Sequence, residues 1–511
     1  MLITHMDCSG INQGRFYKRF RIFFILISSW ALVETDNVQI FPLLSVHLSH
    51  AQTTTSPPSL PMPASGAKYS IPTKYEVGTV SPANLDGDGL LDWVIRRNLK
   101  FAEDNENLIL EARDYFGNYL WEYDTGINKI GTIDRSGWHE AIIVWNIQLD
   151  TDWDEVIVVT KRSVGGQVRR YLTMLDGKTG EVIAEREYPR FPGSDSRRYA
   201  AIAYFGNTPY IVIAEAVTHP GGVTVFDADL RTVWRYEHPY EMGTGHHGVA
   251  TFDLDEDGND EIIYGGTTID AQGRMLWSLS EMLGYGHQDV VVAGNIVPGN
   301  GRNEVAYIGE VGKGALVISY DGENTDKDDV IWHFKEKPPG GYSGLIGNFD
   351  PNYPGDEIVI WPDDCDDFDC TGYTKKMFSA HGEDISSSQY FPQRARRRPD
   401  WNGDGVYDKS NTPCPGICYG ADVGGGLMHG AEEAIRIDTG KAVEVFFNTQ
   451  ALSSPSRWQN RRYRQDVAMV LNGYSYRNYP FRVHDIRGTG NLDQSSPEPP
   501  TDVKVEKNAN D

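Results

Sequence analysis

The sequence predicts an all-β protein and, within that class, a seven-bladed β-propeller. A short acidic loop recurs along the chain, and each copy runs into a hydrophobic strand. No long segment has the 3.6-residue period of an amphipathic helix. The 53 glycines and the aromatic content of 11% also suit a turn-rich β-protein. Repeated units of short strands are typical of propellers.

The acidic loop has three clear copies, with side-chain oxygens at positions one, three, five and nine and glycine at position six. This spacing wraps oxygen ligands around a hard cation such as Ca²⁺. An EF-hand would need flanking helices, whereas strand-forming residues follow these loops. We therefore expect structural Ca²⁺ sites, with ligands Asn84, Asp86, Asp88 and Asp92; Asp253, Asp255, Asp257 and Glu261; and Asp400, Asn402, Asp404 and Asp408.

Four weaker strand-loop-strand units bring the number to seven, and they lie at 141–159, 199–214, 290–308 and 345–361. A tandem array of β-sandwiches is the alternative, but it would show linkers between units, and none is evident after Gly66. We predict one propeller over residues 67–492 and a disordered polar tail over 493–511.

The N-terminal region predicts export. Basic residues between Arg15 and Arg21 precede a short apolar run, and a second apolar stretch ends at Ala51. We expect a signal peptide over 1–51 and a Pro/Ser/Thr-rich linker over 52–66, with an uncleaved membrane anchor as the alternative. The net charge of -25 argues against a nucleic-acid partner and fits a secreted protein. A monomer without stable membrane insertion is expected.

Four of the five cysteines lie beyond the predicted signal peptide, in one C-x4-C pair and one C-x3-C pair. In an exported protein they most simply form two disulfides. A structural Zn²⁺ site is the alternative, because two paired thiolate clusters can supply four ligands. The residues concerned are Cys365, Cys370, Cys414 and Cys418.

Several histidines precede predicted inner strands at matching places, namely His139, His246, His247 and His287. A propeller gathers the loops that enter its innermost strands on one face, so these imidazoles are predicted to converge there. Alternatively, each caps its own blade. Two arginine-rich runs, 394–398 and 461–464, are candidate contacts for a polyanion, with Arg461 as a binding residue.

The run HHGVATFDLDEDGNDEIIYGGTTIDAQGRMLW (246–277) and the following GYGHQD (284–289) resemble the rhamnogalacturonan lyases of polysaccharide lyase family 11. Segments 199–214 and 347–361 are similar too, and the resemblance covers about half of the mature chain. Those lyases are longer and eight-bladed. The seven units and the size of the chain are similar to the ulvan lyases of families 24 and 25, and the shorter chain and the two arginine-rich runs favour ulvan over rhamnogalacturonan as the substrate.

The resemblance implies β-elimination beside a uronate carboxylate, which needs a carboxylate neutraliser, a base and an acid. His139 is the candidate base or carboxylate partner, and Arg235 the candidate neutraliser. His219 stands where the relatives carry a tyrosine, so Tyr204 and Tyr285 are alternative acids. The resemblance also implies that His246, His247 and His287 line the substrate groove.

Two further classes of function stay open. A non-catalytic, calcium-dependent propeller that binds carbohydrate or protein would show no cluster of histidine and tyrosine on one face. A propeller hydrolase would need a pair of metal-free carboxylates near the axis, and the sequence singles out no such pair. A cofactor-dependent oxidoreductase is the remaining enzyme class.

Overall fold

The structure, a computed structural model, describes residues 68–128, 140–191, 198–215, 221–238, 248–284, 288–309, 314–320, 322, 325–335, 342–362, 375–392, 432–437, 441–448 and 461–472. The chain divides into two units, Met1–Thr54 and Thr55–Asp511, and every described residue belongs to the second. None of the helices in these ranges has the length and apolar character needed to cross a membrane.

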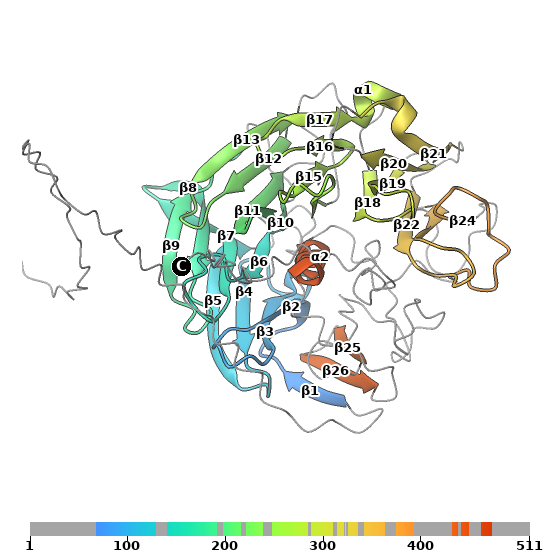
Figure 1. Cartoon of the computed structure of the whole chain (residues 1–511). Helices are drawn as coiled ribbons and strands as arrows, with labels where there is room; N and C mark the ends of the chain where they lie inside the picture. Colours follow the sequence, from blue (N-terminus) through green and yellow to red (C-terminus); the bar gives the residue numbers. More distant parts are fainter. Residues whose placement is uncertain are drawn as a thin grey trace, which may run out of the picture. The chain divides into compact units, whose positions relative to one another are not determined.

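The described strands form antiparallel sheets, most of them built from strands that are consecutive in sequence (Figure 1). Five sheets have four strands each: β2 (Val77–Ala83), β3 (Asp92–Arg97), β4 (Asn107–Arg113) and β5 (Tyr119–Asn128); β6 (Ile142–Trp145), β7 (Glu155–Val164), β8 (Gln167–Leu175) and β9 (Val182–Glu187); β10 (Arg198–Phe205), β11 (Thr208–Glu215), β12 (Gly221–Phe226) and β13 (Thr232–His238); β14 (Ala250–Phe252), β15 (Glu261–Tyr264), β16 (Thr267–Ile269) and β17 (Met275–Ser278); and β18 (Gln288–Gly294), β19 (Asn303–Gly309), β20 (Gly314–Tyr320) and β21 (Val330–Phe334).

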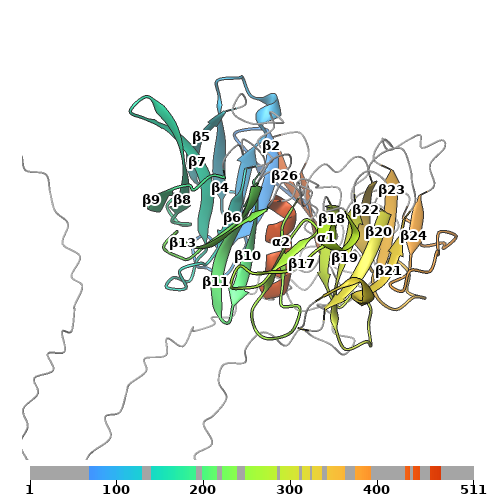
Figure 2. The same cartoon turned by 90° about the horizontal axis from the view of Figure 1, so that it is seen from above.

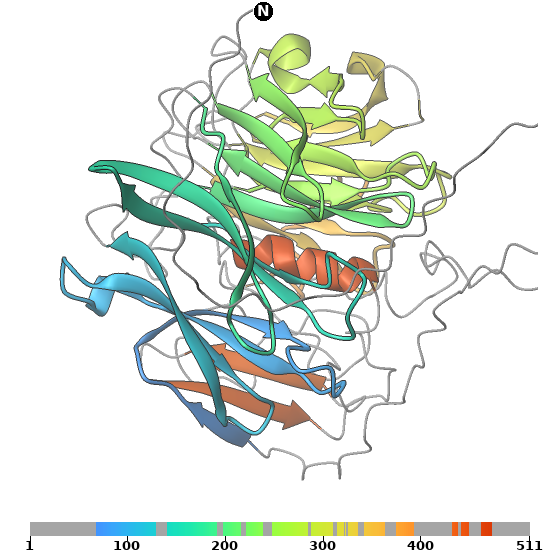
Figure 3. The ribbon, with the colours of Figure 1, turned by 90° about the vertical axis from the view of Figure 1, so that its left-hand side faces the viewer.

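Two further sheets have three described strands each: β22 (Tyr342–Gly347), β23 (Glu357–Pro362) and β24 (Lys376–Phe378); and β1 (Lys68–Pro72), β26 (Ala442–Asn448) and β25 (Glu432–Ile437). In the second of these, the first described strand pairs with strands from near the C-terminal end of the described chain (Figure 3). The described helices are α1 (Leu279–Leu283), α2 (Arg461–Asn472) and the 3-10 helices η1 (Leu99–Phe101) and η4 (Lys327–Asp329).

Consecutive sheets pack face to face, which explains the hydrophobic runs of their first strands. Val94 and Leu110 of the first sheet pack against Val144 and Val156 of the second, and all four are buried. Similar clusters join the later sheets in chain order. Strands covered on both faces are apolar throughout, as in Ile142–Trp145, whereas the outermost strand β13 alternates between exposed and covered residues.

An indole also joins neighbouring sheets at three places. At each of the three, a tryptophan on an outermost strand donates its Nε1–H to a backbone carbonyl in a turn of the next sheet: Trp121 to Gly177 (2.6 Å), Trp234 to Ala271 (2.9 Å) and Trp332 to Ala380 (2.7 Å). The turn presses against the ring, since a Cβ on Gly180 would lie 2.7 Å from Trp121. These contacts fix the spacing of the sheets as well as their order.

The sheets carry different features at the two ends of their strands, and we call these two ends the acidic edge and the entry edge. The acidic edge carries the loops between first and second strands, at 84–91, 146–154, 253–260, 295–302 and 348–356. These loops share one edge because Asn84 N donates to Asp154 Oδ2 (2.8 Å) and Asp356 N donates to Ile296 O (3.0 Å), each between consecutive sheets. The entry edge is the opposite one, where β2, β6, β10, β14, β18 and β22 begin.

Helix α2 lies against the first strands β2, β6, β10 and β14, and Figure 1 shows it almost end-on between them, while Figure 2 shows it lengthwise. Gln465 Nε2 donates to Asp260 Oδ2 (2.7 Å), and Arg464 pairs with Asp154 (2.8 Å). The predicted polyanion run 461–464 thus contributes Arg464 to an internal ion pair.

The prediction of an all-β protein is confirmed. Six of the seven predicted units form the hairpins β2–β3, β6–β7, β10–β11, β14–β15, β18–β19 and β22–β23, and the unit at 400–408 lies outside the described residues. Over the described ranges the row of sheets does not close between β22–β24 and β25. The closed seven-bladed ring and the domain boundaries at 67 and 492 therefore stay predictions.

Candidate functional site

The acidic edge is organised by a carboxylate at the start of the second strand. Glu261 Oε2 accepts a hydrogen bond from the backbone N–H of Leu254 (2.8 Å), and Glu357 Oε2 accepts one from Phe349 (2.6 Å). Asp92, Glu155 and Glu304 accept backbone hydrogen bonds from their own loops in the same way. Each carboxylate ties the loop to its strand, because buried backbone N–H groups need an acceptor.

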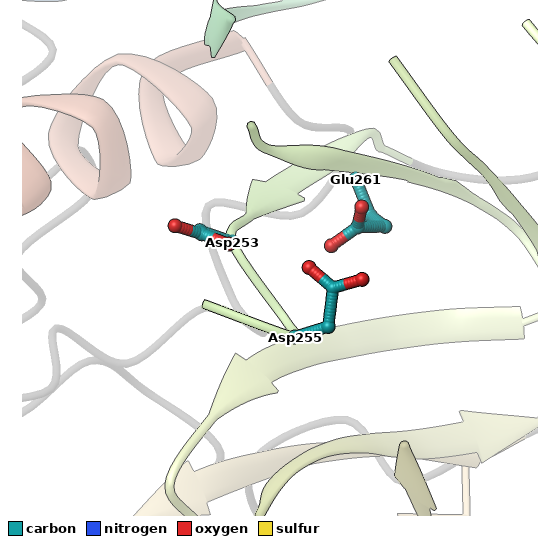
Figure 4. Close-up of side chains that lie close together, drawn as sticks. All are labelled: Asp253, Asp255 and Glu261. Atoms are coloured by element: carbon teal, nitrogen blue, oxygen red, sulfur yellow. The ribbon is translucent and has the colours of Figure 1, made fainter. Parts of the chain in front are cut away.

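The loop 253–261 fits a divalent cation best. Carboxylate oxygens of Asp253, Asp255 and Glu261 lie within 4.8 Å of one another, in reach of one Ca²⁺ with oxygen ligands at roughly 2.3–2.6 Å. In Figure 4 the carboxylates of Asp255 and Glu261 face each other. Asp253 Oδ1 is buried and lacks a hydrogen-bond partner within the described ranges. Asp257 instead accepts hydrogen bonds from Asn259.

The loop 84–92 uses its predicted ligands in turn contacts. Asn84 Oδ1 accepts from Gly87 N (3.1 Å), Asp86 Oδ1 from Asp88 N (3.0 Å) and Asp92 Oδ2 from Leu85 N (2.8 Å). In the described part of the chain, its carboxylates do not gather as closely as those of the loop 253–261. The third predicted loop, with Asp400, Asn402, Asp404 and Asp408, lies outside the described residues.

Burial raises the pKa of four carboxyl groups at the acidic edge. The pKa of Glu261 rises to about 9, with the neighbouring aspartates adding to the effect, and that of Glu357 rises to about 8. The pKa of Asp92 rises to about 7 and that of Asp253 to about 6, again mainly through burial. A bound cation would favour the ionised forms, so the loop 253–261 is suited to exchange protons for a metal ion.

The entry edge carries a buried ion network instead. The Arg198 guanidinium, 1% exposed, donates to Glu140 Oε2 (3.0 Å) and pairs with Glu215 Oε1 (3.1 Å). These residues belong to two sheets, and Arg96 of a third sheet donates to the backbone carbonyl of Glu140 (2.9 Å). Arg170 Nη1 lies 3.6 Å from Glu140 Oε1.

We name this group the arginine cluster: Arg170, Arg190, Arg198, Arg235, Glu140 and Glu215. Arg235 Nη2 donates to Arg190 O (3.4 Å), and the charge of Arg190 acts on Glu215. As defined, the cluster holds four guanidinium groups and two carboxylates, which makes its members net positive within a chain of net charge -25. A surplus of positive charge held at fixed positions favours an anionic ligand.

Tyr188 lies within the arginine cluster. Burial raises its pKa well above the usual range, so the phenol stays protonated and can donate a hydrogen bond. Neither the Tyr188 hydroxyl nor Arg170 Nη1 has a hydrogen-bond partner among the residues that the structure describes. The cluster therefore contains buried O–H and N–H donors that have no hydrogen-bond acceptor among the described residues.

The structure places one predicted site residue at this cluster. Arg235 lies on the outermost strand β13, exposed, with its guanidinium 4.2 Å above the Phe191 ring. Tyr204 and Arg461 lie elsewhere. Arg461 stacks 4.2 Å above the Tyr204 ring, and the Tyr204 hydroxyl accepts from Trp145 Nε1 (3.1 Å). Tyr204 is at the acidic end of β10, about 20 Å along the strand from Arg198.

The other predicted site residues lie outside the described residues: His139, His219, His246, His247, Tyr285 and His287, and the cysteines Cys365, Cys370, Cys414 and Cys418. In sequence, His139 directly precedes Glu140, and His219 follows Glu215 by four residues. Both histidines are thus joined to the arginine cluster by short stretches of chain.

The buried members of the cluster are not predicted from the sequence. Arg198 and Glu215 stand at strand ends, where a charged residue normally faces solvent; they pair with each other across the β10–β11 hairpin, and Arg198 reaches Glu140 through sheet packing. The one local signal is a charge directly beside a hydrophobic run, as in Arg198 before YAAIAYF and Glu140 before AIIVW.

Comparison with known proteins finds similarity to one family of enzymes. Residues 162–410 match the profile "Rhamnogalacturonan lyase family 11, C-terminal domain". The chain is 26% identical over 380 residues to the rhamnogalacturonan exolyase YesX of Bacillus subtilis, covering 65% of this chain and 59% of that protein. It is 24% identical over 331 residues to the endolyase YesW of the same organism, covering 56% of this chain and 52% of that protein. The chain thus spans somewhat more than half the length of these curated relatives.

Solved structures give the same fold. The structure of YesX superposes with a TM-score of 0.66 at 22% identity, over 84% of this chain and 82% of that chain. A rhamnogalacturonan lyase of Bacillus licheniformis superposes with a TM-score of 0.64 at 20% identity, over 82% of this chain and 81% of that chain. The fold is that of this class of lyases. The chain is related to rhamnogalacturonan lyase family 11, which confirms the resemblance predicted from residues 246–289.

Proposed function

We propose that the protein is a secreted polysaccharide lyase that cleaves rhamnogalacturonan by β-elimination. The observation that carries this proposal is the net positive arginine cluster at the entry edge. The match of residues 162–410 to the family 11 lyases supports the reaction class. A uronate polymer presents repeated carboxylates, and the cluster is built to receive such a group.

The proposed reaction assigns distinct tasks to the site. A base removes the proton at C5 of the uronate, the C4–O4 bond breaks with formation of a C4–C5 double bond, and an acid protonates the departing oxygen. Positive charge near the carboxylate makes the C5 proton more acidic and stabilises the charge that develops. Arg235, an exposed member of the cluster and the predicted neutraliser, takes this task. His139 remains the candidate base or carboxylate partner, and His219, Tyr204 and Tyr285 remain the candidates for the acid.

Rhamnogalacturonan is preferred to ulvan as the substrate. The preference for ulvan depends on the shorter chain and on the arginine runs, and neither curated relative nor the family profile supports it. Both curated relatives carry rhamnogalacturonan in their names. One is named an exolyase and the other an endolyase, so they favour neither mode of attack here.

Ca²⁺ is proposed as a structural cofactor at 253–261, where three carboxylates meet, one of which, that of Asp253, has a buried oxygen without a hydrogen-bond partner among the described residues. This loop is at the acidic edge, so the cation would stabilise the fold and leave neutralisation of the substrate to the arginine cluster. Export and a monomeric state remain proposals from the sequence.

The test incubates the purified protein with rhamnogalacturonan and with ulvan. The proposal predicts ultraviolet absorbance from a newly formed unsaturated uronate, faster on rhamnogalacturonan. New reducing ends without that absorbance would mean hydrolysis. Binding without any new ends would mean a non-catalytic propeller.

A further inference from the structure

The β7–β8 hairpin extends past its own sheet at the entry edge. The last residue pair of β6 with β7 is Ile142 with Val158, whereas β7 and β8 stay paired out to Val164 with Gln167. Strand β9 pairs with β8 only as far as Tyr171. Residues 161–170 therefore form a two-stranded arm about 13 Å long. Figure 3 shows this teal hairpin reaching past the ends of neighbouring strands.

The arm is built to hold its shape. Gly165 and Gly166 have φ of 59° and 78°, as a tight two-residue hairpin turn requires. At its base, a Cβ on Gly126 of β5 would lie 2.0 Å from Lys161 O, so the neighbouring sheet packs directly against the arm. Arg170 anchors the other strand to Glu140 in the arginine cluster.

The arm carries basic residues opposite each other on its two strands. The sequence KRSVGGQVRR (161–170) has four basic residues and no acidic one, in a chain with 72 acidic and 47 basic residues. The strand register sets Lys161 opposite Arg170 and Arg162 opposite Arg169. Like charges directly opposite each other on paired strands destabilise a sheet. Glu185 and Glu187 of β9 offset part of this charge, and a ligand with negative charge would offset it further.

Two of the guanidinium groups remain accessible. The side chain of Arg162 is 42% exposed and that of Arg169 is 41% exposed. Glu185 pairs with Arg162 and Glu187 with Arg169, and Arg162 also donates to the Tyr123 hydroxyl (3.3 Å). Exposed pairs of this kind bind weakly, so they orient the guanidinium groups and still leave them available to an anion.

We propose that the arm 161–170 is a second binding site for the anionic polysaccharide, which holds uronate residues of the same chain at a distance from the bond that is cleaved. The identity of this ligand, an anionic polysaccharide, rests on the proposed function. Both sites lie at the entry edge, because Arg170 at the base of the arm belongs to the arginine cluster. A long chain would reach both sites, whereas a short oligosaccharide would reach only the cluster.

The experiment compares Arg162→Gln/Arg169→Gln with Arg231→Gln/Arg274→Gln as matched control. The control residues are also exposed and ion-paired, at 60% and 75% exposure, but lie in turns at the acidic edge. Binding is measured without turnover, by retardation in gels that contain polygalacturonate or neutral dextran. We expect about tenfold weaker retardation by polygalacturonate for the arm variant only. Initial rates should show a higher KM for the long polymer and an unchanged KM for a short oligosaccharide.

Equal retardation of the arm variant, the control variant and the unmodified protein would overturn the proposal, and so would equally strong binding of the arm to double-stranded DNA. Arg162→Lys/Arg169→Lys keeps the charge and should keep the binding. If the double Gln variant does not fold, Arg169→Gln alone should weaken retardation about threefold, and no change would overturn the proposal. Arm-dependent retardation by a protein that cleaves nothing would reject the lyase reaction and leave the arm as a binding site.

Discussion

The two edges of the sheets solve the problem of buried charge in different ways. At the acidic edge, the carboxylate that starts the second strand accepts from its own loop, as Glu261 does from Leu254 N and Glu357 from Phe349 N. At the entry edge, Arg198 pairs with Glu215 of its own sheet and with Glu140, which lies just before the strands of another sheet. The first arrangement repeats from sheet to sheet, whereas among the described residues the second occurs once.

This difference indicates which edge suits the proposed reaction. A contact that recurs in five of the sheets serves the fold that they share, so we interpret the acidic edge as structural. A group assembled from several sheets, and found once among the described residues, is not explained as a repeat feature. We therefore assign the proposed reaction to the entry edge.

The largest expected effect is at the centre of the arginine cluster. Arg198→Met leaves Glu140 and Glu215 buried without their cation, which should lower the free energy of unfolding by about 3–5 kcal/mol. Urea denaturation measures this. Arg274→Met, an exposed ion-pair residue at the acidic edge, should change it by less than about 1 kcal/mol. Equal effects would contradict the distinction between the edges.

The next effect concerns the cation at the acidic edge. A chelator should lower the melting temperature, because a ligand at a hundred times its Kd stabilises by about 2.7 kcal/mol. Asp255→Asn should remove most of this response, since Asp255 faces Glu261 across the proposed site. Differential scanning calorimetry with and without Ca²⁺ is the measurement. An unchanged melting temperature after chelation would rule out the Ca²⁺ assignment.

A pH effect follows from Glu357, whose pKa burial raises to about 8. The folded protein holds this proton more tightly than the unfolded chain, so stability is highest below the unfolded pKa and falls as pH rises toward 8. The slope amounts to at most one proton, about 1.4 kcal/mol per pH unit. In chelator, Glu357→Gln should flatten the decline between pH 5 and 8. The same slope in both proteins would exclude Glu357 as a source.

The smallest effect is expected at Tyr204. Tyr204→Phe removes the hydroxyl that accepts from Trp145 and should cost about 1 kcal/mol of stability. Because Tyr204 is at the acidic end of β10, kcat should stay within about twofold of the unmodified protein. A loss of a hundredfold in kcat would instead support Tyr204 as the acid and place the reaction at the other edge.

The sequence predicts what is local and repeated. Loops such as 84–92 and 253–261 carry their own hydrogen-bond partners within nine residues, so the strand-loop-strand units and the all-β class can be read directly. Arg235 was also predicted, through a resemblance. Arg198 and Glu215 flank the predicted unit 199–214 and lie opposite each other in its hairpin, whereas Glu140 is 58 residues from Arg198 and reaches it through the packing of two sheets, which no local pattern specifies.

The most direct test of the assignment to the entry edge compares two single substitutions that remove the same charge from exposed arginines. Initial rates of formation of unsaturated uronate from rhamnogalacturonan are measured for Arg235→Gln and Arg274→Gln. The account predicts a loss of about a hundredfold in kcat/KM for Arg235→Gln and full activity for Arg274→Gln. Full activity of Arg235→Gln, or an equal loss in both variants, would contradict it.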